Sequence, residues 1–92
     1  MQMRIDQTRW VVRHLAWLIA TGQPCECEAS QAKVIATETL QDLSNQAMQL
    51  FASHGYSDDS DIQRIWRDAR LYTFGEGTNE IQRDLIARHL GL

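Results

Sequence analysis

The sequence predicts an all-α protein, an antiparallel helical bundle, and two observations lead to that fold class. Apolar residues recur at intervals of three and four over most of the 92 residues, which is the spacing that places side chains on one face of a helix. No segment shows the alternation of apolar and polar residues that a half-buried strand needs. Because the chain has one proline and five glycines, long helices are possible, and short connections between them favour antiparallel packing.

The first helix is expected over about residues 4–21. Gly22 and Pro24 should end it, because a glycine commonly follows the last turn of a helix and proline cannot continue one. Trp10 and Trp17 add a second apolar stripe to the helix. Most of its surface is therefore expected to need covering.

The second helix is expected over about residues 28–53, with Gly55 as its stop. At about 1.5 Å per residue it would be close to 40 Å long. Its apolar stripe begins with small residues that allow close approach of a neighbouring helix. Lys33 interrupts this alanine-rich face and is interpreted as a snorkelling side chain or a subunit contact.

Two shorter helices complete the prediction. The run Ser60-Asp61-Ile62-Gln63 fits a capping box at the start of the third helix, in which the serine oxygen and the glutamine side chain satisfy free amide groups. On the third helix, Arg67, Asp68 and Arg70 are interpreted as a surface ion-pair set. Either Thr78 or the next residue can cap the last helix.

Composition narrows the classes of function. A chain of 92 residues makes one domain, residues 1–92, with a thin core. The net charge of −3 argues against nucleic acid as a partner. No apolar run is long enough for a transmembrane helix, and the N-terminus lacks the apolar segment of a signal peptide. A cytoplasmic protein is expected, and Cys25 and Cys27 are then expected to be reduced thiols without a metal.

The segment with the clearest chemical potential is Gly75-Glu76-Gly77. Glycines allow positive φ angles and close approach of another molecule. A carboxylate in such a turn, next to the start of a helix, can meet a ligand, and its backbone N–H is free to donate. The pattern alone also fits an ordinary interhelical turn with a solvated glutamate.

A longer match bears on this choice. The stretch from Arg67 to Arg88, with Arg67-Asp68-Ala69-Arg70, Glu76-Gly77-Thr78 and Ile81-Gln82-Arg83, resembles the C-terminal signature of acyl-CoA dehydrogenases. Upstream, the run from Gln49 to Tyr56 is similar to a second family motif. The resemblance covers nearly the whole chain. It implies part of the family's C-terminal four-helix bundle, without the first helix of that bundle and without the domains that precede it.

The resemblance implies a function. Such enzymes use FAD to form an α,β double bond in an acyl-CoA thioester, and they pass electrons to an electron-transfer flavoprotein. Glu76 matches the base that removes the α-proton, and Gly77 matches a position lining the thioester. The positions that match contacts to FAD are Thr78, Asn79 and Glu80 at the last helix, and Gln49 and Ser53, which reach FAD bound mainly by a neighbouring subunit. The intact protein is expected to be a homo-oligomer, a tetramer or a dimer.

Three departures from the family pattern qualify this expectation. Gly75 stands where a tyrosine is frequent, which suggests room for a bulkier or branched acyl group. Ala52-Ser53 replaces a pair of glycines that lies close to FAD. The chain is also shorter than the family, so by itself it is expected to be inactive. The alternatives are a non-catalytic helical oligomerisation module derived from the family and a related acyl-CoA oxidase.

Overall fold

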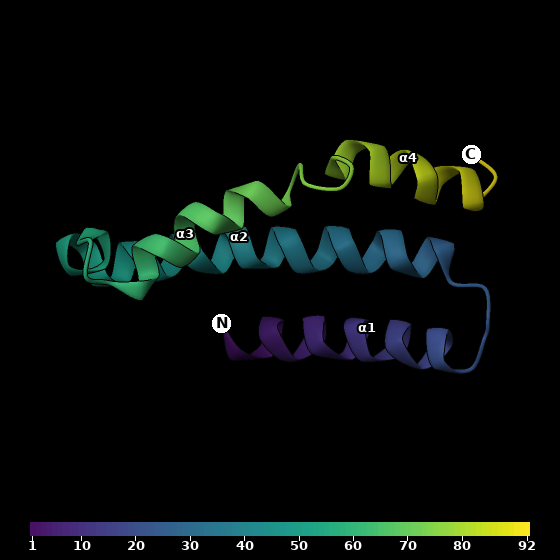
Figure 1. Cartoon of the computed structure of the whole chain (residues 1–92), viewed down its shortest axis with the longest axis horizontal. Helices are drawn as coiled ribbons and strands as arrows, with labels where there is room; N and C mark the ends of the chain where they lie inside the picture. Colours follow the sequence, from purple (N-terminus) through teal and green to yellow (C-terminus); the bar gives the residue numbers. More distant parts are fainter.

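The computed structural model describes all 92 residues as four helices, α1 (Gln2–Ala20), α2 (Glu26–Tyr56), α3 (Asp61–Tyr72) and α4 (Asn79–His89). The central helix is α2: α1 packs along one side, while α3 and α4 follow each other along the other side (Figure 1). All three run antiparallel to α2, which confirms the all-α antiparallel prediction. The molecule measures 46 × 24 × 18 Å. None of its helices combines the length and hydropathy that crossing a membrane would take.

The end of α1 confirms the predicted stop at Gly22. This glycine has φ +69°, the left-handed conformation that glycine adopts without a steric penalty. Its N–H donates to the carbonyl of Ile19 at 3.1 Å, and the N–H of Gln23 donates to the carbonyl of Leu18 at 3.0 Å. These two bonds satisfy carbonyls that the helix end would otherwise leave free.

The end of α2 differs from the prediction, because the helix extends to Tyr56 and contains the expected stop, Gly55. The regular helix is interrupted earlier, at Ala52, with φ 46° and ψ −128°. Gly55 has another role: it is buried, and a Cβ there would lie 3.0 Å from Phe51 Cβ and 3.5 Å from Ile62 Cγ2. The glycine therefore allows the last turn of α2 to pack closely against α3.

Replacing Ala52 by glycine is expected to stabilise the protein. The backbone of Ala52 lies in a region that favours glycine, and such strain costs about 1–3 kcal/mol. We expect Ala52→Gly to raise the free energy of unfolding by about 1 kcal/mol, after the greater flexibility of glycine in the unfolded chain is subtracted. Urea denaturation measures the change.

The matched control for this change is Ala16→Gly, at an exposed position inside α1. There the same substitution should lower the free energy of unfolding by about 1 kcal/mol, because glycine is a poor helix former. If both substitutions destabilise equally, the strain at Ala52 is not real.

The start of α3 has half of the predicted capping box. The hydroxyl of Ser60 accepts from the N–H of Ile62 at 3.1 Å, as predicted. Gln63 does not return the bond, since its side chain donates to the carbonyl of Asp58 at 3.5 Å. The N–H of Ser60 donates instead to the carbonyl of Ser57 at 3.0 Å. The N–H of Ser60, which the Gln63 side chain was expected to bind, is therefore already hydrogen-bonded within the turn before α3.

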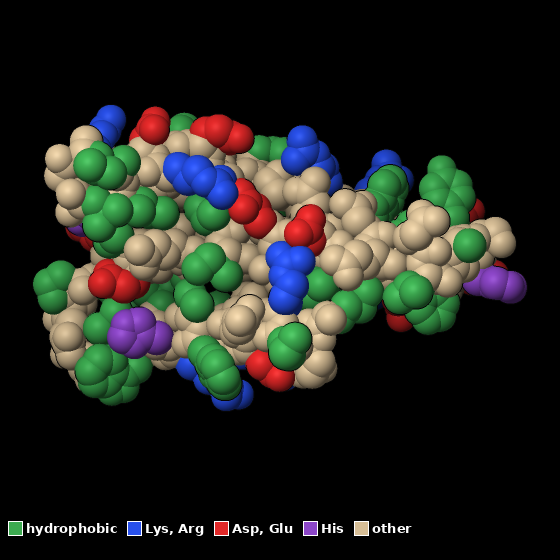
Figure 2. All heavy atoms as spheres, turned by 180° about the vertical axis from the view of Figure 1, so that it is seen from behind, with side chains coloured by type: hydrophobic (Ala, Val, Ile, Leu, Met, Phe, Trp, Pro, Cys, Tyr) green, Lys and Arg blue, Asp and Glu red, His purple; other side chains and the backbone are tan.

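The core is thin, as expected for this length. Nine of the 92 residues are buried, and Leu18, Ala32, Val34 and Ala69 are the apolar ones. Large side chains are left open: Trp10 is 67% and Trp17 is 54% exposed. Apolar side chains are spread over the surface along α1 and where α2 meets α3 (Figure 2). Because so little apolar area is buried, hydrogen bonds and ion pairs contribute to holding the other helices and the α3–α4 loop on α2.

Candidate active site

The loop between α3 and α4 (Figure 1) carries Glu76, which is exposed. The loop begins where the N–H of Gly75 donates to the carbonyl of Leu71 at 2.8 Å. It closes where the N–H of Asn79 donates to the carbonyl of Thr73 at 3.0 Å. These two bonds fold the five residues from 74 to 78 into a compact turn directly before α4.

The start of α4 confirms one of the two caps that the sequence allowed. Thr78 is the N-cap, and its hydroxyl accepts from the N–H of Ile81 at 3.2 Å. Glu80 lies in the first turn, where a negative charge is favourable. The positive end of this helix therefore faces the loop that carries Glu76.

Glu76 has a backbone conformation that is uncommon for a residue with a side chain. Its φ is +56°, and Gly77 follows with φ +93°. The N–H of Glu76 donates to no group in the chain, while its carbonyl accepts from the Gln82 side chain at 3.5 Å. No ion pair involves its carboxylate. Both the carboxylate and the N–H are therefore available to a ligand.

Lys33, on α2, binds this loop through its side chain. Lys33 Nζ donates to the carbonyl of Gly77 at 2.8 Å, to Asn79 Oδ1 at 2.7 Å and to the carbonyl of Thr73 at 3.4 Å. Sequence reasoning missed this contact and interpreted Lys33 as a snorkelling or subunit-contact residue. The available signal was that Lys33 is the only lysine and stands on a face of small residues.

Asn79 joins the loop to α2 through a side chain that is only 4% exposed. Its Nδ2 donates to Thr37 Oγ1 at 3.0 Å and to Glu38 Oε1 at 3.3 Å, while its Oδ1 accepts from Lys33. Buried polar groups are costly unless they are paired in this way. The side chain of Asn79 is thus engaged within the chain, and its expected contact with FAD stays a prediction.

An ion pair continues this network. Arg83 donates to both carboxylate oxygens of Glu38, at 2.6 and 2.9 Å. The hydrogen bond from Arg83 lowers the pKa of Glu38 from its ordinary value of 4.5, against an opposing effect of burial. Two-point pairs of this kind fix geometry as well as charge. The pair therefore helps to set where α4 lies on α2.

The lowered pKa of Glu38 predicts a pH effect. Its contribution to stability is fully present above the ordinary pKa of 4.5 and is lost as the pH falls through the lower pKa of the folded protein. Because both side chains of the pair are about half exposed, the loss should stay under about 1 kcal/mol. Urea denaturation between pH 7 and about pH 3 should show a smaller acid loss in Glu38→Gln than in the wild type. Asp59→Asn, at an exposed loop residue without an ion pair, should keep the wild-type pH dependence.

The structure divides the predicted site residues into two groups. Glu76, Gly77, Thr78, Asn79 and Glu80 lie together in the loop and the first turn of α4. The second group, Gln49 and Ser53, is exposed near the far end of α2. Since 16 residues separate Gln49 from Lys33 along the helix, Gln49 lies about 24 Å along α2 from the lysine that contacts the loop, and Ser53 lies beyond it.

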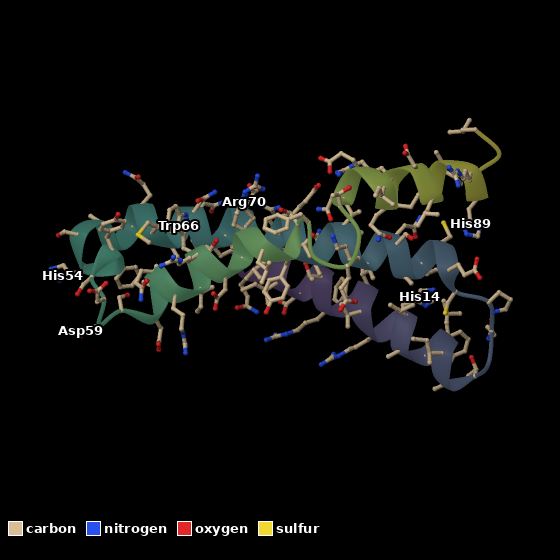
Figure 3. All side chains as sticks on the ribbon, turned by 45° about the horizontal axis from the view of Figure 1, so that its top comes forward. His14, His54, Asp59, Trp66, Arg70 and His89 are labelled. Carbon is tan, nitrogen blue, oxygen red and sulfur yellow. The ribbon has the colours of Figure 1, made fainter.

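Other polar residues on α3 differ from the prediction. Arg70 (Figure 3) donates to Thr73 Oγ1 at 3.0 Å, near the loop. The ion pair on α3 is Arg64 with Asp61 at 3.1 Å. Arg67, Asp68 and Arg70 therefore do not form the expected ion-pair set. The spacing of these three residues would allow them to pair, but the Arg70 guanidinium binds Thr73 at the end of α3 instead.

Possible metal ligands are dispersed. His54 and His89 lie at opposite ends of the molecule (Figure 3). No group of three histidine, cysteine, aspartate or glutamate side chains is arranged to hold a metal ion. Both cysteines are free thiols.

Comparison with known proteins now identifies the family. The family described as "Acyl-CoA dehydrogenase, C-terminal domain" matches residues 1–91. The chain belongs to the acyl-CoA dehydrogenase family. A probable acyl-CoA dehydrogenase of Bacillus subtilis, YngJ, is 43% identical over 90 residues, which cover 98% of this chain and 24% of that protein.

Solved structures agree with the helical arrangement. Butyryl-CoA dehydrogenase from Megasphaera elsdenii superposes with a TM-score of 0.96 at 32% identity, over 100% of this chain and 24% of that one. PigA in complex with FAD gives a TM-score of 0.95 at 27% identity, with the same coverage. The chain thus spans about a quarter of the length of the relatives it matches.

Proposed function

We propose that this chain is the C-terminal catalytic portion of an FAD-dependent acyl-CoA dehydrogenase, with Glu76 as the base that accepts the α-proton. The observation that supports this most is the Glu76 turn, which presents an unpaired carboxylate and a free N–H from one residue. An interhelical turn without such a function would not need a non-glycine residue at φ +56°.

The chemistry requires both groups of Glu76. The α-proton of a thioester is weakly acidic, so the carbonyl oxygen needs a hydrogen-bond donor while negative charge develops on it. The N–H of Glu76 can donate that bond, and the carboxylate accepts the proton as the α C–H bond breaks. Gly77 leaves space beside the thioester because it has no side chain. The products are an α,β-enoyl-CoA, a proton on the Glu76 carboxylate and a hydride from the β-carbon, which carries the two electrons.

FAD supplies the acceptor for the β-hydrogen, which leaves as hydride. On this chain Thr78 is the N-cap of α4 and Glu80 lies in its first turn, directly after the turn that carries Glu76. They fit contacts with a polar cofactor at the start of α4. Gln49 and Ser53 lie too far along α2 to share that contact, so we assign them to FAD of a neighbouring subunit in a homo-oligomer. An electron-transfer flavoprotein is the proposed electron acceptor.

The test uses the full-length protein that contains this segment. Adding an acyl-CoA thioester without oxygen should bleach the flavin absorbance and produce enoyl-CoA. An unchanged flavin spectrum with a series of acyl-CoA chain lengths would instead favour a non-catalytic helical module. Rapid reoxidation by oxygen without an electron-transfer flavoprotein would identify an acyl-CoA oxidase.

Gly75 offers a test of substrate preference. A Cβ at this position would lie 3.3 Å from the carbonyl of Leu71, so a side chain there fits only with a small shift and would project beside Glu76. We expect Gly75→Tyr in the full-length protein to lower kcat/KM for branched acyl-CoA by about tenfold relative to straight-chain acyl-CoA, the scale of steric selection in an apolar pocket. Gly75→Ala is the control and should change the ratio little. An unchanged preference in the tyrosine variant would remove the idea.

A further inference from the structure

Lys33 binds the loop between α3 and α4 at positions before and after Glu76. It binds the carbonyl of Thr73 before this residue and the carbonyl of Gly77 directly after it, at 3.4 and 2.8 Å. Its third bond goes to Asn79 Oδ1 at 2.7 Å, at the start of α4. A lysine ammonium has three donors on one compact charge, and here all three have acceptors on the segment that carries Glu76.

The conformation of Glu76 requires such support. A left-handed φ at a residue with a side chain persists only where its surroundings enforce it. The one side-chain hydrogen bond to the Glu76 backbone is the 3.5 Å contact from Gln82, on α4. Lys33 is anchored on α2, the longest helix, and its neighbours Ala32 and Val34 are buried. The lysine therefore connects the turn to the central helix of the molecule.

The position of α4 itself does not depend on Lys33 alone. Arg83 and Glu38 form a separate two-point ion pair between α4 and α2. Asn79 also donates to Thr37 and Glu38. Removing the ammonium therefore leaves α4 attached, and releases the carbonyls that flank Glu76.

We propose that Lys33 is a positioning residue for catalysis, which holds the Glu76 carboxylate and N–H in their working geometry by binding the backbone on either side. This inference rests on the proposed function of Glu76. Lys33, which lies on α2 and far from the loop in the sequence, would then control the removal of the α-proton.

The test replaces Lys33 by methionine, which keeps an unbranched apolar stem, in the full-length protein loaded with FAD. We expect kcat to fall by about 10- to 100-fold, the scale of a small misplacement of a catalytic group, while bound FAD per subunit is unchanged. Hydrogen exchange of the backbone amides of residues 75–78 should become faster. The matched control is Arg4→Met, which removes an ion pair between α1 and α2 at 3.0 Å and should leave kcat and the exchange of this loop unchanged.

Three results would overturn the role of Lys33. One is a wild-type kcat in Lys33→Met beside an inactive Glu76→Gln protein, and another is unchanged amide exchange at residues 75–78. The third is a loss of bound FAD in proportion to the loss of kcat, which would make Lys33 a purely structural residue. Retained α-proton exchange in Glu76→Gln would overturn the proposed function instead, so the two failures are distinct.

A second variant keeps the test decisive if Lys33→Met does not fold. Lys33→Arg preserves the charge, but its planar guanidinium cannot match three acceptors that converge on one ammonium. It is expected to fold, to lose about 3- to 10-fold in kcat and to show faster exchange in the loop. Wild-type values of both quantities would contradict the proposal.

Discussion

Glu76→Gln in the full-length protein is expected to reduce turnover of acyl-CoA by about 100- to 10,000-fold, the usual contribution of a general base. Glutamine has nearly the same shape as glutamate and can occupy the same turn, but its amide cannot accept the α-proton. We expect the turn to keep its conformation, with φ +56° at this position in the wild type, so that the free N–H remains in place. Binding of FAD and of acyl-CoA should therefore persist while proton removal stops.

Exchange of the α-proton with deuterium oxide isolates this step from the transfer of hydride. It should be lost in Glu76→Gln and retained in Glu28→Gln, which removes a carboxylate from the first turn of α2 that forms no ion pair. Wild-type exchange in Glu76→Gln would place the base on another residue.

Gly77→Ala is expected to have the second largest effect, because it disturbs the turn directly after Glu76. Gly77 has φ +93°, and an added Cβ would lie 2.9 Å from Gln82 Nε2. The glutamine side chain can move, but the backbone strain remains and costs about 1–3 kcal/mol. The turn should relieve this strain by shifting, which moves both groups of Glu76. We expect kcat to fall by about 10- to 100-fold.

A matched substitution separates strain from position. Gly91 has φ +77° near the C-terminus, with open space where a Cβ would lie. Gly91→Ala should lower the free energy of unfolding by a similar amount, about 1–2 kcal/mol, and leave kcat unchanged. Equal loss of kcat in both variants would show that general destabilisation, and not the position of Glu76, limits activity.

The helices were predictable because their signals are local. The apolar spacing, the Gly22 stop and the Ser60 cap each act over a few neighbouring residues. The break at Ala52 was not predictable, since alanine favours the continuation of a helix. The turn that follows Ala52 contains Gly55, which lies against Ile62 of α3, and such a contact between two helices leaves no signal in the local sequence.

The candidate site was predictable in part for the same reason. The turn around Glu76 was expected from two glycines and from a family motif. The contacts of Lys33 were not, because they join residues that are 40 to 46 positions apart. No periodic pattern encodes which face of α2 the loop will meet. The assignment of Gln49 and Ser53 to FAD depends on how a second subunit packs against this one, which the local sequence does not specify.

The role of Glu76 as the base is tested most directly by a crystal structure of the full-length protein with FAD and a non-reacting acyl-CoA thioester analogue. We expect a Glu76 carboxylate oxygen to lie about 3–3.5 Å from the α-carbon of the analogue, which is the separation of a productive arrangement. The N–H of Glu76 should donate to the thioester carbonyl at about 2.9 Å, with Lys33 still bound to the carbonyl of Gly77. A thioester bound elsewhere, with Glu76 turned toward solvent, would contradict this role.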